Sequence, residues 1–491
     1  MRFQSTLLLF FCFFFFKMHG QAPEKPSSSD IYHSIQKLNF LGSALYIAAH
    51  PDDENTRLIS YLSNGVKART GYLSITRGDG GQNLIGPELK ELLGVLRTQE
   101  LLGARSIDGG EQFFTRAVDF GYSKHPDETL RIWNKEEVLG DVVRVIRQFK
   151  PDVIVNRFDH RTPGSTHGQH TSSAMLSTEA FDLVGSDNAY PSQLESLETW
   201  QPRRLFFNTS WWFYGSRENF EKADKSNLIS VDTGVFYPIL GLSNNELASM
   251  ASSQHKCQGF GRLTTRGSET EYLEIINGDL PQGDQSIFEG IDTSWSRIEG
   301  GKKIGEILYA VEENFNFTNP SVHLKDLLKA YSLLQNVSDA HWKPIKSEEL
   351  KALIGAVSGL YLEAATSAPV TVPGSDVTVK VEALNRSDTP ITLKAIQING
   401  KDIETSELAI ENNKKENIEF QVSIPDNATY TSPYWLNKKG SLGMYSVEDA
   451  DLIGKPETPE AYIAQFDLDF NGTVISLDRP LVYRYSEPDQ G

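Results

Sequence analysis

Cysteine, clusters of basic residues and long hydrophobic runs are all scarce in this 491-residue sequence. Its two cysteines, Cys12 and Cys257, are too few for a disulfide framework. The net charge is −18 and no run of Lys or Arg is present, which argues against a nucleic-acid-binding protein. Beyond the first twenty residues no apolar run is long enough to cross a bilayer, and no internal repeat is apparent. The composition favours a globular protein of about three domains at ~150 residues each.

The first twenty residues have the layout of a secretory signal. Arg2 precedes an apolar run, Leu7–Phe16, which is too short to span a bilayer, and Gly20 follows shortly after it. We therefore expect residues 1–20 to be a signal peptide that is cleaved after Gly20, and the protein to be exported to the periplasm or the extracellular space. Cys12 would be lost on cleavage, which leaves Cys257 as a single, buried thiol.

Residues 21–295 alternate between strand-like and helix-like patterns. Apolar runs typical of buried strands occupy 43–49, 71–76, 113–118, 153–156 and 205–208. Helical spacing of apolar residues follows the first run as far as Gly65, and recurs over 87–104, 135–149 and 167–184. This alternation predicts an α/β fold, with a mostly parallel sheet and helices on both faces.

The pattern changes beyond this first domain. Residues 296–365 are expected to form a helical connector, because apolar residues fall on one helical stripe: Leu350, Leu353, Ile354, Val357, Leu360 and Tyr361. From 366 to 491 the period becomes two, with turns at Pro373-Gly374 and Asn399-Gly400. This predicts an antiparallel, Ig-like β-sandwich. A strand-like run, 481–485, lies close to the last residue, which leaves open whether the sequence is a fragment of a longer protein.

An imidazole and three carboxylates directly follow the first predicted strand. His50, Asp52, Asp53 and Glu54 come immediately after the run 43–49. Open α/β sheets keep their ligand sites at the carboxyl ends of strands. Because adjacent carboxylates repel one another, the cluster favours a bound cation or proton that compensates their charge. The structural alternative is a pair of polar caps.

A second group of candidate ligands lies more than a hundred residues further on, in the segment 161–170. Ser165 or Thr166 is expected to cap a helix there, which would place His167 and His170 three residues apart on one face. A metal site needs ligands from separate parts of the chain, and these two segments supply them.

Zinc in catalytic sites typically takes three His or carboxylate ligands and leaves a position for water. We predict His50, Asp53 and His170 as the ligands, a set that would also accept ferrous iron or another divalent ion. Adjacent residues in an extended segment point in different directions, so Asp52 is left to accept a proton from the attacking water as general base. His167 would stabilise the oxyanion or protonate the leaving amine.

These motifs resemble those of a known family. Residues 49–54, Ala-His-Pro-Asp-Asp-Glu, followed by His167-x-x-His170, are similar to the PIG-L/LmbE-like zinc-dependent N-deacetylases, such as GlcNAc-PI de-N-acetylases and mycothiol-pathway deacetylases. The resemblance implies a Rossmann-like α/β domain over roughly residues 40–290. It also implies the same roles: zinc ligation by His50, Asp53 and His170, with Asp52 as base and His167 assisting the tetrahedral intermediate.

Two further family features recur. A T-x-G-E-x-G loop near the substrate is similar to residues 76–81, with Asp79 in place of Glu, and an R-x-x-E pair matches Arg97 and Glu100. The resemblance implies that Asp79 and Arg97 contact substrate, whereas a turn and a surface ion pair are the structural alternatives. The later motif departs from the family, since many relatives have H-P-D-H where this sequence has His-Gly-Gln-His.

The resemblance implies a zinc hydrolase that removes an acetyl group from a GlcNAc-type amino sugar or a related small amide. Its partner would be a small-molecule or glycan substrate, without nucleic acid and without a transmembrane segment after signal cleavage. Two alternatives stay open: a different amide such as a thiol conjugate, and a carbohydrate-binding protein that keeps the metal site without turnover. Tyr430, Tyr434 and Trp435 would stack on sugars or pack at a domain junction. Three other histidines are interpreted as structural: His125, His160 and His255.

Overall fold

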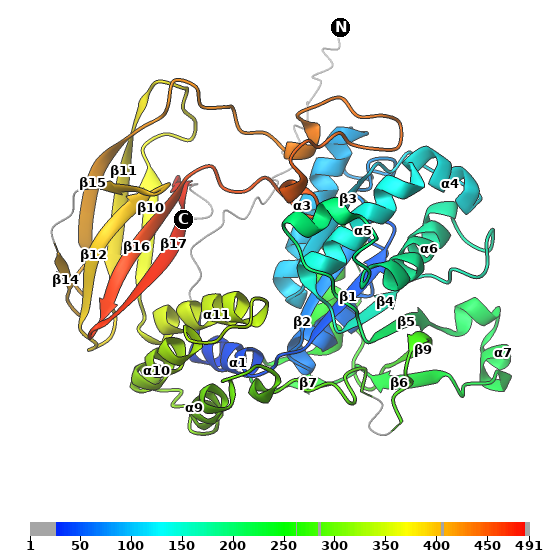
Figure 1. The fold of residues 1–491 in the computed structure, drawn as a ribbon, viewed down its shortest axis with the longest axis horizontal. Coiled ribbons are helices and arrows are strands. Elements are labelled where there is room, and N and C mark those ends of the chain that lie inside the picture. The colour runs from blue at the N-terminus through cyan, green and yellow to red at the C-terminus, as the bar shows by residue number, and fades with distance from the viewer. Residues whose placement is uncertain (1–25, 262, 283–285, 404–406, 487–491) are drawn as a thin grey trace, which may run out of the picture.

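The structure is a computed structural model that describes residues 26–261, 263–282, 286–403 and 407–486. The predicted signal peptide 1–20, with Cys12, lies outside the described residues. The described chain has three parts: an α/β part, a curled β-sheet to its left, and a group of helices below that sheet (Figure 1). No helix among the described residues combines the length and the apolar character needed to span a membrane.

Seven strands form the sheet of the α/β part, in the order β3-β2-β1-β4-β5-β9-β6. Their bounds are β1 Ser43–Ala48, β2 Arg69–Thr76, β3 Glu111–Ala117, β4 Val153–Asn156, β5 Arg204–Thr209, β6 Leu228–Asp232 and β9 Thr270–Gly278. The first five strands in this order pair in parallel, and β9 and β6 add two antiparallel pairs. The predicted mixed α/β fold with a mostly parallel sheet is confirmed.

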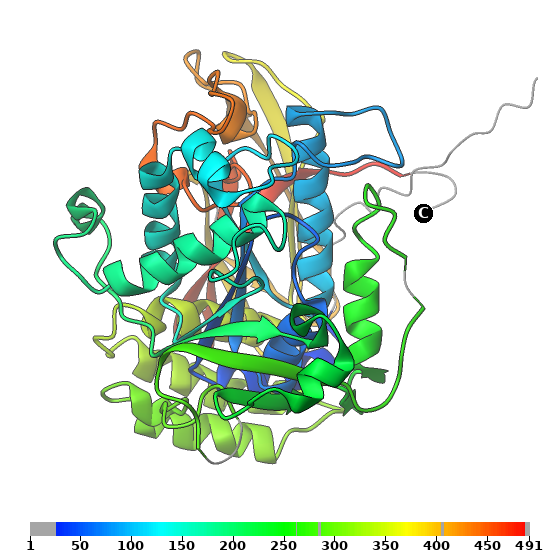
Figure 2. The same cartoon turned by 90° about the vertical axis from the view of Figure 1, so that its right-hand side faces the viewer.

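Helices cover both faces of this sheet (Figure 2). They are α2 Thr56–Ser60, α3 Glu91–Asp108, α4 Pro126–Trp133, α5 Lys135–Phe149, α6 Gly168–Leu183, α7 Arg217–Lys222 and α8 Asn244–Ser252. Strand β1 shows why two layers are needed, because alternate side chains point to opposite faces. Leu45 and Ile47 join a core with α5 and α6, whereas Ala44 and Tyr46 join another with α2 and α3.

The order of the parallel strands positions the site. From β1 the chain moves outward through β2 to β3, and then returns to the other side of β1 to form β4 and β5. Neighbouring connections therefore diverge at the carboxyl ends of β1 and β4, and open α/β sheets bind ligands in the crevice at such a point.

Four of the described helices form a layer of their own; one precedes the α/β part in the sequence and three follow it. The layer consists of α1 Ser28–Leu38, α9 Lys302–Glu313, α10 Leu324–Leu334 and α11 Trp342–Val357, which share one apolar core with the C-terminal sheet. The predicted helical stripe is wrong at its end: α11 stops at Val357, Gly359 takes a positive φ of 57°, and Tyr361 begins a strand. A glycine in this left-handed conformation commonly terminates a helix.

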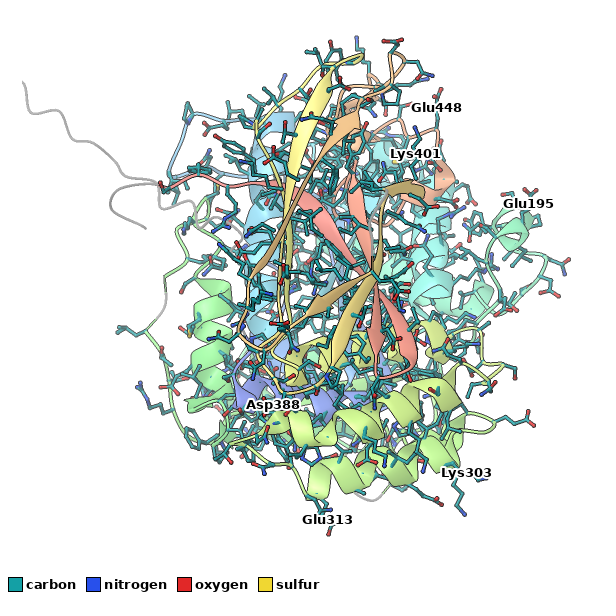
Figure 3. The ribbon with its side chains drawn as sticks, turned by 90° about the vertical axis from the view of Figure 1, so that its left-hand side faces the viewer. Glu195, Lys303, Glu313, Asp388, Lys401 and Glu448 are labelled. Carbon is teal, nitrogen blue, oxygen red and sulfur yellow. The ribbon has the colours of Figure 1, made fainter. Side chains whose placement is uncertain are left out.

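The C-terminal part is a curled sheet in the order β13-β12-β16-β17-β10-β11-β15, with β14 paired to β12 (Figure 3). Its strands are β10 Tyr361–Thr366, β11 Asp376–Leu384, β12 Ile391–Ile398, β13 Lys401–Ile403, β14 Leu408–Ile410, β15 Glu416–Ser423, β16 Ile463–Phe470 and β17 Thr473–Tyr483. A two-stranded pair, β7 Phe236–Tyr237 and β8 Leu242–Ser243, lies elsewhere. All pairs in the curled sheet are antiparallel except β10 with β17. An antiparallel C-terminal sheet is therefore present, and the limits 21–295, 296–365 and 366–491 stay predictions.

Candidate metal centre

The structure brings the two predicted ligand segments together at the crevice. His50 follows β1, and His167 and His170 lie at the amino end of α6. The ring centroids of His50 and His170 are 5.2 Å apart, and those of His50 and His167 are 5.3 Å apart. Two segments more than a hundred residues apart in the sequence therefore meet at one edge of the sheet.

His50, Asp53 and His170 are arranged as a metal-binding group. Their candidate ligand atoms all lie within 4.8 Å of one another. The Nδ1 atom of His50 is 3.0 Å from Oδ2 of Asp53, and Nε2 of His170 is 3.4 Å from Oδ1 of Asp53. Zinc binds nitrogen and oxygen at about 2.0–2.2 Å in tetrahedral geometry, so donor atoms separated by roughly 3.5 Å suit it. The donors present fit a divalent ion.

Each candidate histidine ligand is held from a second direction. Nε2 of His50 donates to Oε1 of Gln169 at 2.7 Å, which leaves Nδ1 facing Asp53. The ring of His170 stacks on Phe158, with centroids 4.0 Å apart. Partners of this kind fix the tautomer and orientation of metal-binding histidines. Gln169 occupies the third position of the His-Gly-Gln-His motif, where many relatives of the resembled family have Asp, and it provides the acceptor for His50.

Asp52 faces a different partner from its neighbour Asp53. Its backbone has a positive φ of 123°, which is rare for a residue other than glycine and turns the side chain away from that of Asp53. Oδ1 of Asp52 pairs with Nη2 of Arg97 at 3.0 Å. The same guanidinium donates to the Pro51 carbonyl at 2.8 Å. The two aspartates therefore have different partners. Their roles, metal ligand for Asp53 and general base for Asp52, stay predictions.

The electrostatic environment separates the two carboxylates further. Burial raises the pKa of Asp52 to about 6, although Arg97 opposes the shift. Burial also acts to raise the pKa of Asp53, but His170 and His50 outweigh it and hold that pKa well below its usual range. Burial lowers the pKa of His170 to about 4, which favours the neutral imidazole that a metal requires.

His167 is the N-cap of α6, so the predicted cap at Ser165 or Thr166 is wrong. A turn with Gly164 at a φ of 83° comes before the helix, which begins at Gly168. Nδ1 of His167 accepts a hydrogen bond from the backbone N–H of Gln169 at 3.1 Å. Burial and the nearby His50 lower the pKa of His167. A neutral imidazole that accepts at Nδ1 carries its proton on Nε2, where it can donate.

A buried network supports the backbone beneath Asp52. Oε2 of Glu54 accepts from the backbone N–H of Asp52 at 3.0 Å, and Oε1 of Glu54 contacts Nε2 of His255 at 2.7 Å. Arg105 pairs with Glu54 at 3.3 Å and with Asp108 at 2.5 Å. His255 therefore has the structural contact expected from the sequence. It holds Glu54, which in turn bonds the backbone of Asp52.

The two predicted substrate contacts are both buried. Arg97 is 3% exposed and is engaged with Asp52 and the loop carbonyls. Asp79 is 4% exposed; it accepts a hydrogen bond from the Tyr445 hydroxyl, and its Oδ2 accepts one from the backbone N–H of Asp119 at 3.3 Å. Burial raises the pKa of Asp79 to about 6. Contact of either residue with substrate stays a prediction.

Sequence reasoning missed four residues that complete the surroundings of the site. They are Gln169, Asp119, Arg105 and Tyr445. The position of Gln169 between two candidate histidines was a usable signal. No local pattern marks Asp119 or Tyr445, because each acts through contacts between distant parts of the chain.

One protein-family model matches residues 45–181, a range that contains both ligand segments: PIG-L, described as GlcNAc-PI de-N-acetylase. A mycothiol S-conjugate amidase of Streptomyces coelicolor is 27% identical over 178 residues, which are 33% of this chain and 59% of that protein. A 1D-myo-inositol 2-acetamido-2-deoxy-alpha-D-glucopyranoside deacetylase of Kineococcus radiotolerans is 27% identical over 204 residues, 35% of this chain and 55% of that protein. The chain thus spans a little over half the length of these curated relatives.

Among solved structures, an N,N'-diacetylchitobiose deacetylase from Pyrococcus horikoshii is similar at 18% identity. The match covers 44% of this chain and 70% of that one, with a TM-score of 0.33.

Proposed function

We propose, from the premise that residues 45–181 are a domain of the PIG-L family, that this protein is a zinc-dependent amide hydrolase. Its substrate would be an N-acetylated amino sugar of the GlcNAc type, from which it releases acetate. The observation that carries the proposal is the convergence of His50, Asp53 and His170, with ligand atoms within 4.8 Å of one another. The names of the two curated relatives, an amidase and a deacetylase, support amide hydrolysis.

Zinc held by these three side chains would polarise the substrate carbonyl and lower the pKa of a water toward ~7. Asp52 would accept the proton of the attacking water, because it is the chain neighbour of Asp53 and is not part of the candidate metal group. Arg97 holds that carboxylate in position through the 3.0 Å ion pair. The base is therefore oriented before substrate arrives.

His167 would act on the substrate oxygen. With Nδ1 occupied by the N–H of Gln169, its Nε2–H is available to donate a hydrogen bond to the oxyanion as the carbonyl is attacked. The lowered pKa keeps the ring neutral before the reaction. This assignment favours oxyanion stabilisation over protonation of the leaving amine, the other role considered for His167.

The same chemistry on a thiol conjugate is a second candidate. The match to the mycothiol S-conjugate amidase is the observation that favours it. The residues that would activate water are the same for both substrates, so only the product distinguishes them. We further propose that the protein is exported, on the strength of the signal-like segment 1–20.

The decisive experiment measures metal content and product release on the purified full chain. Zinc-loaded protein is incubated with N-acetyl amino sugars and with a mycothiol S-conjugate, and acetate and free amine are quantified. We expect acetate from the sugars, complete loss after chelation, and recovery on adding zinc. Zinc binding without release of acetate or amine from either class would overturn the hydrolase proposal and favour a carbohydrate-binding role.

Asp52→Asn tests the base. We expect kcat to fall by at least about 100-fold while zinc still binds, since a positioned general base typically contributes that much. Asp127→Asn is the matched control, because Asp127 is exposed and pairs only with His125 outside the site. Undiminished turnover in Asp52→Asn would reject the assignment.

A further inference from the structure

The C-terminal sheet sends one long connection back to the α/β part. Residues 425–462, called here the crossing segment, join β15 to β16 and reach α3 and β3 on the way; they are the orange stretch in Figure 1. The backbone N–H of Phe114 donates to Gly454 at 3.1 Å, and that of Tyr445 donates to Arg116 at 2.8 Å. The crossing segment therefore bonds to the edge strand of the catalytic sheet. Glu448, labelled in Figure 3, lies on it.

Arg77, the residue directly after β2, fastens the crossing segment. Its guanidinium lies between two aromatic rings, 3.5 Å from the centroid of Trp435 and 4.2 Å from that of Phe114. It also donates to the carbonyls of Lys455 and Pro456 at 3.1 and 2.9 Å. A buried cation held by several such contacts keeps both partners in one geometry. Trp435 thus packs at the junction between two parts of the molecule, as does Tyr434.

Tyr445, on the crossing segment, makes a second contact with the loop after β2. Its partner there is Asp79, two residues after Arg77. The Tyr445 hydroxyl donates to Asp79, and the Tyr445 ring is buried against Val95 of α3 and Val118. Asp79 in turn accepts from the backbone N–H of Asp119 at 3.3 Å. The crossing segment therefore supplies the hydroxyl partner of a buried carboxylate that sits beside the site.

From Asp119 the contacts continue to a candidate metal ligand. Oδ1 of Asp119 accepts from Nε2 of Gln169 at 3.3 Å, and Oε1 of Gln169 accepts from His50 at 2.7 Å. Four successive hydrogen bonds thus connect Tyr445 with the imidazole of His50. Because His50 has its other nitrogen toward Asp53, the orientation of its ring depends on Gln169.

Two glycines in the loop after β2 lie too close to neighbouring groups to carry a side chain. A Cβ on Gly80 would collide with the backbone at Asp119 and Gly121, and one on Gly81 would collide with the guanidinium of Arg97. Arg97 is the partner of Asp52. A displacement of this loop would therefore reach the site from two sides, through Arg97 and through Asp119.

We propose that the crossing segment is an intramolecular brace for the metal centre and that Tyr445 is a positioning residue, acting through Asp79, Asp119 and Gln169 on His50. The inference rests on the proposed function only in taking His50 as a metal ligand. It assigns the C-terminal sheet a role: it carries the segment that completes the surroundings of the site, although it lies outside the matched residues 45–181.

The test compares Tyr445→Phe with Tyr430→Phe in the full-length protein. Both variants lose one hydroxyl from the crossing segment, but Tyr430 is 77% exposed and Tyr445 is buried. Three quantities are measured: zinc affinity by competition with a chelator, the visible absorption spectrum of the cobalt-substituted site, and amide exchange of a peptide covering residues 77–83. Chemical unfolding reports global stability.

We expect Tyr445→Phe to bind zinc about three- to tenfold more weakly, at the lower end of the loss seen when outer partners of metal ligands are removed. The cobalt spectrum should change and exchange in 77–83 should accelerate, while Tyr430→Phe matches the wild type. Unchanged affinity, spectrum and exchange in Tyr445→Phe would overturn the brace, as would equal losses in both variants.

A wild-type protein that binds no divalent ion would instead overturn the proposed function, so the two failures are distinguishable. If Tyr445→Phe does not fold, Asp79→Asn is judged by the same criteria. It offers one acceptor oxygen in place of the two carboxylate oxygens that accept from Tyr445 and from the Asp119 amide. Wild-type zinc affinity in a folded Asp79→Asn would overturn the proposal.

Discussion

Two neighbouring loops of the seven-stranded sheet both contain aspartates but contact different parts of the chain. The loop after β1, residues 49–54, and the loop after β2, residues 77–81, both follow buried parallel strands and both carry aspartates. In the first, His50 and Asp53 converge with His170 into a group that fits a metal ion. In the second, Arg77 and Asp79 are bonded to the crossing segment of the C-terminal part.

The difference shows that a place at the carboxyl edge of a sheet does not by itself bring a residue into the candidate metal group. What decides is which distant segment covers the loop. The first loop meets the amino end of α6, which brings two more imidazoles. The second meets the aromatic residues Trp435 and Tyr445, which bury its charges. Substitutions in the two loops should therefore have different kinds of effect.

Removing a ligand from the first site should have the largest effect, and on metal binding rather than on stability. We expect His170→Ala to weaken zinc binding by at least about 100-fold, since the loss of an outer partner alone typically costs 10–100-fold. Its unfolding free energy should stay within about 1 kcal/mol of the wild type. Competition with a chelator and chemical unfolding measure the two quantities. His125→Ala is the matched control, because His125 is half-exposed and outside the group. Tight zinc binding by His170→Ala would contradict the assignment of the first loop to a metal site.

The second loop should show the opposite pattern, a loss of stability. Arg77→Ala removes two aromatic contacts and leaves buried carbonyls without donors, which should cost about 4 kcal/mol. Urea unfolding measures the change. Lys222→Ala, which removes an exposed helical ion pair with Glu218, should leave stability unchanged. A fully stable Arg77→Ala would show that the attachment of the crossing segment does not depend on the contacts of Arg77.

The pH dependence of stability should isolate the contribution of Asp79 in the second loop. The pKa of Asp79 is raised from 3.8 to about 6 by burial, so the folded state holds this proton more tightly than the unfolded chain. Its contribution is therefore full below about pH 4 and is lost as the pH rises through 6, by at most about 3 kcal/mol. Asp79→Asn lacks this titration. Unfolding free energies of both proteins from pH 4 to 7.5 should diverge in that window, and parallel curves would contradict the expectation.

Sequence reasoning was strongest where the signal is local. The strand before His50 and the pairing of His167 with His170 could be read directly, because apolar runs and short spacings report on adjacent residues. The end of α11 differs from the prediction because Gly359 takes a left-handed conformation, and the start of α6 differs because a histidine caps it in place of Ser or Thr. Domain limits, export and zinc itself stay predictions.

The contacts that surround the site were beyond reach. Asp79 and Arg97 were marked as substrate contacts from a resemblance, and nothing in their neighbourhood reveals that Tyr445, more than three hundred residues away, donates to Asp79. His255 looked unremarkable because its partner Glu54 lies two hundred residues earlier. Long-range pairings of this kind leave no periodic trace in a single sequence.

The bonds between the crossing segment and β3 also constrain how the chain folds. Strand β3 is the edge of the parallel sheet, and several of its outer backbone groups pair with residues 443–454, which are synthesised long after it. Until then a nascent chain would carry an open edge strand, a known starting point for aggregation. Contacts this distant in sequence also slow the final folding step. A chaperone that shields this edge would therefore be most useful late in biosynthesis, when almost everything except the last strands has already been made.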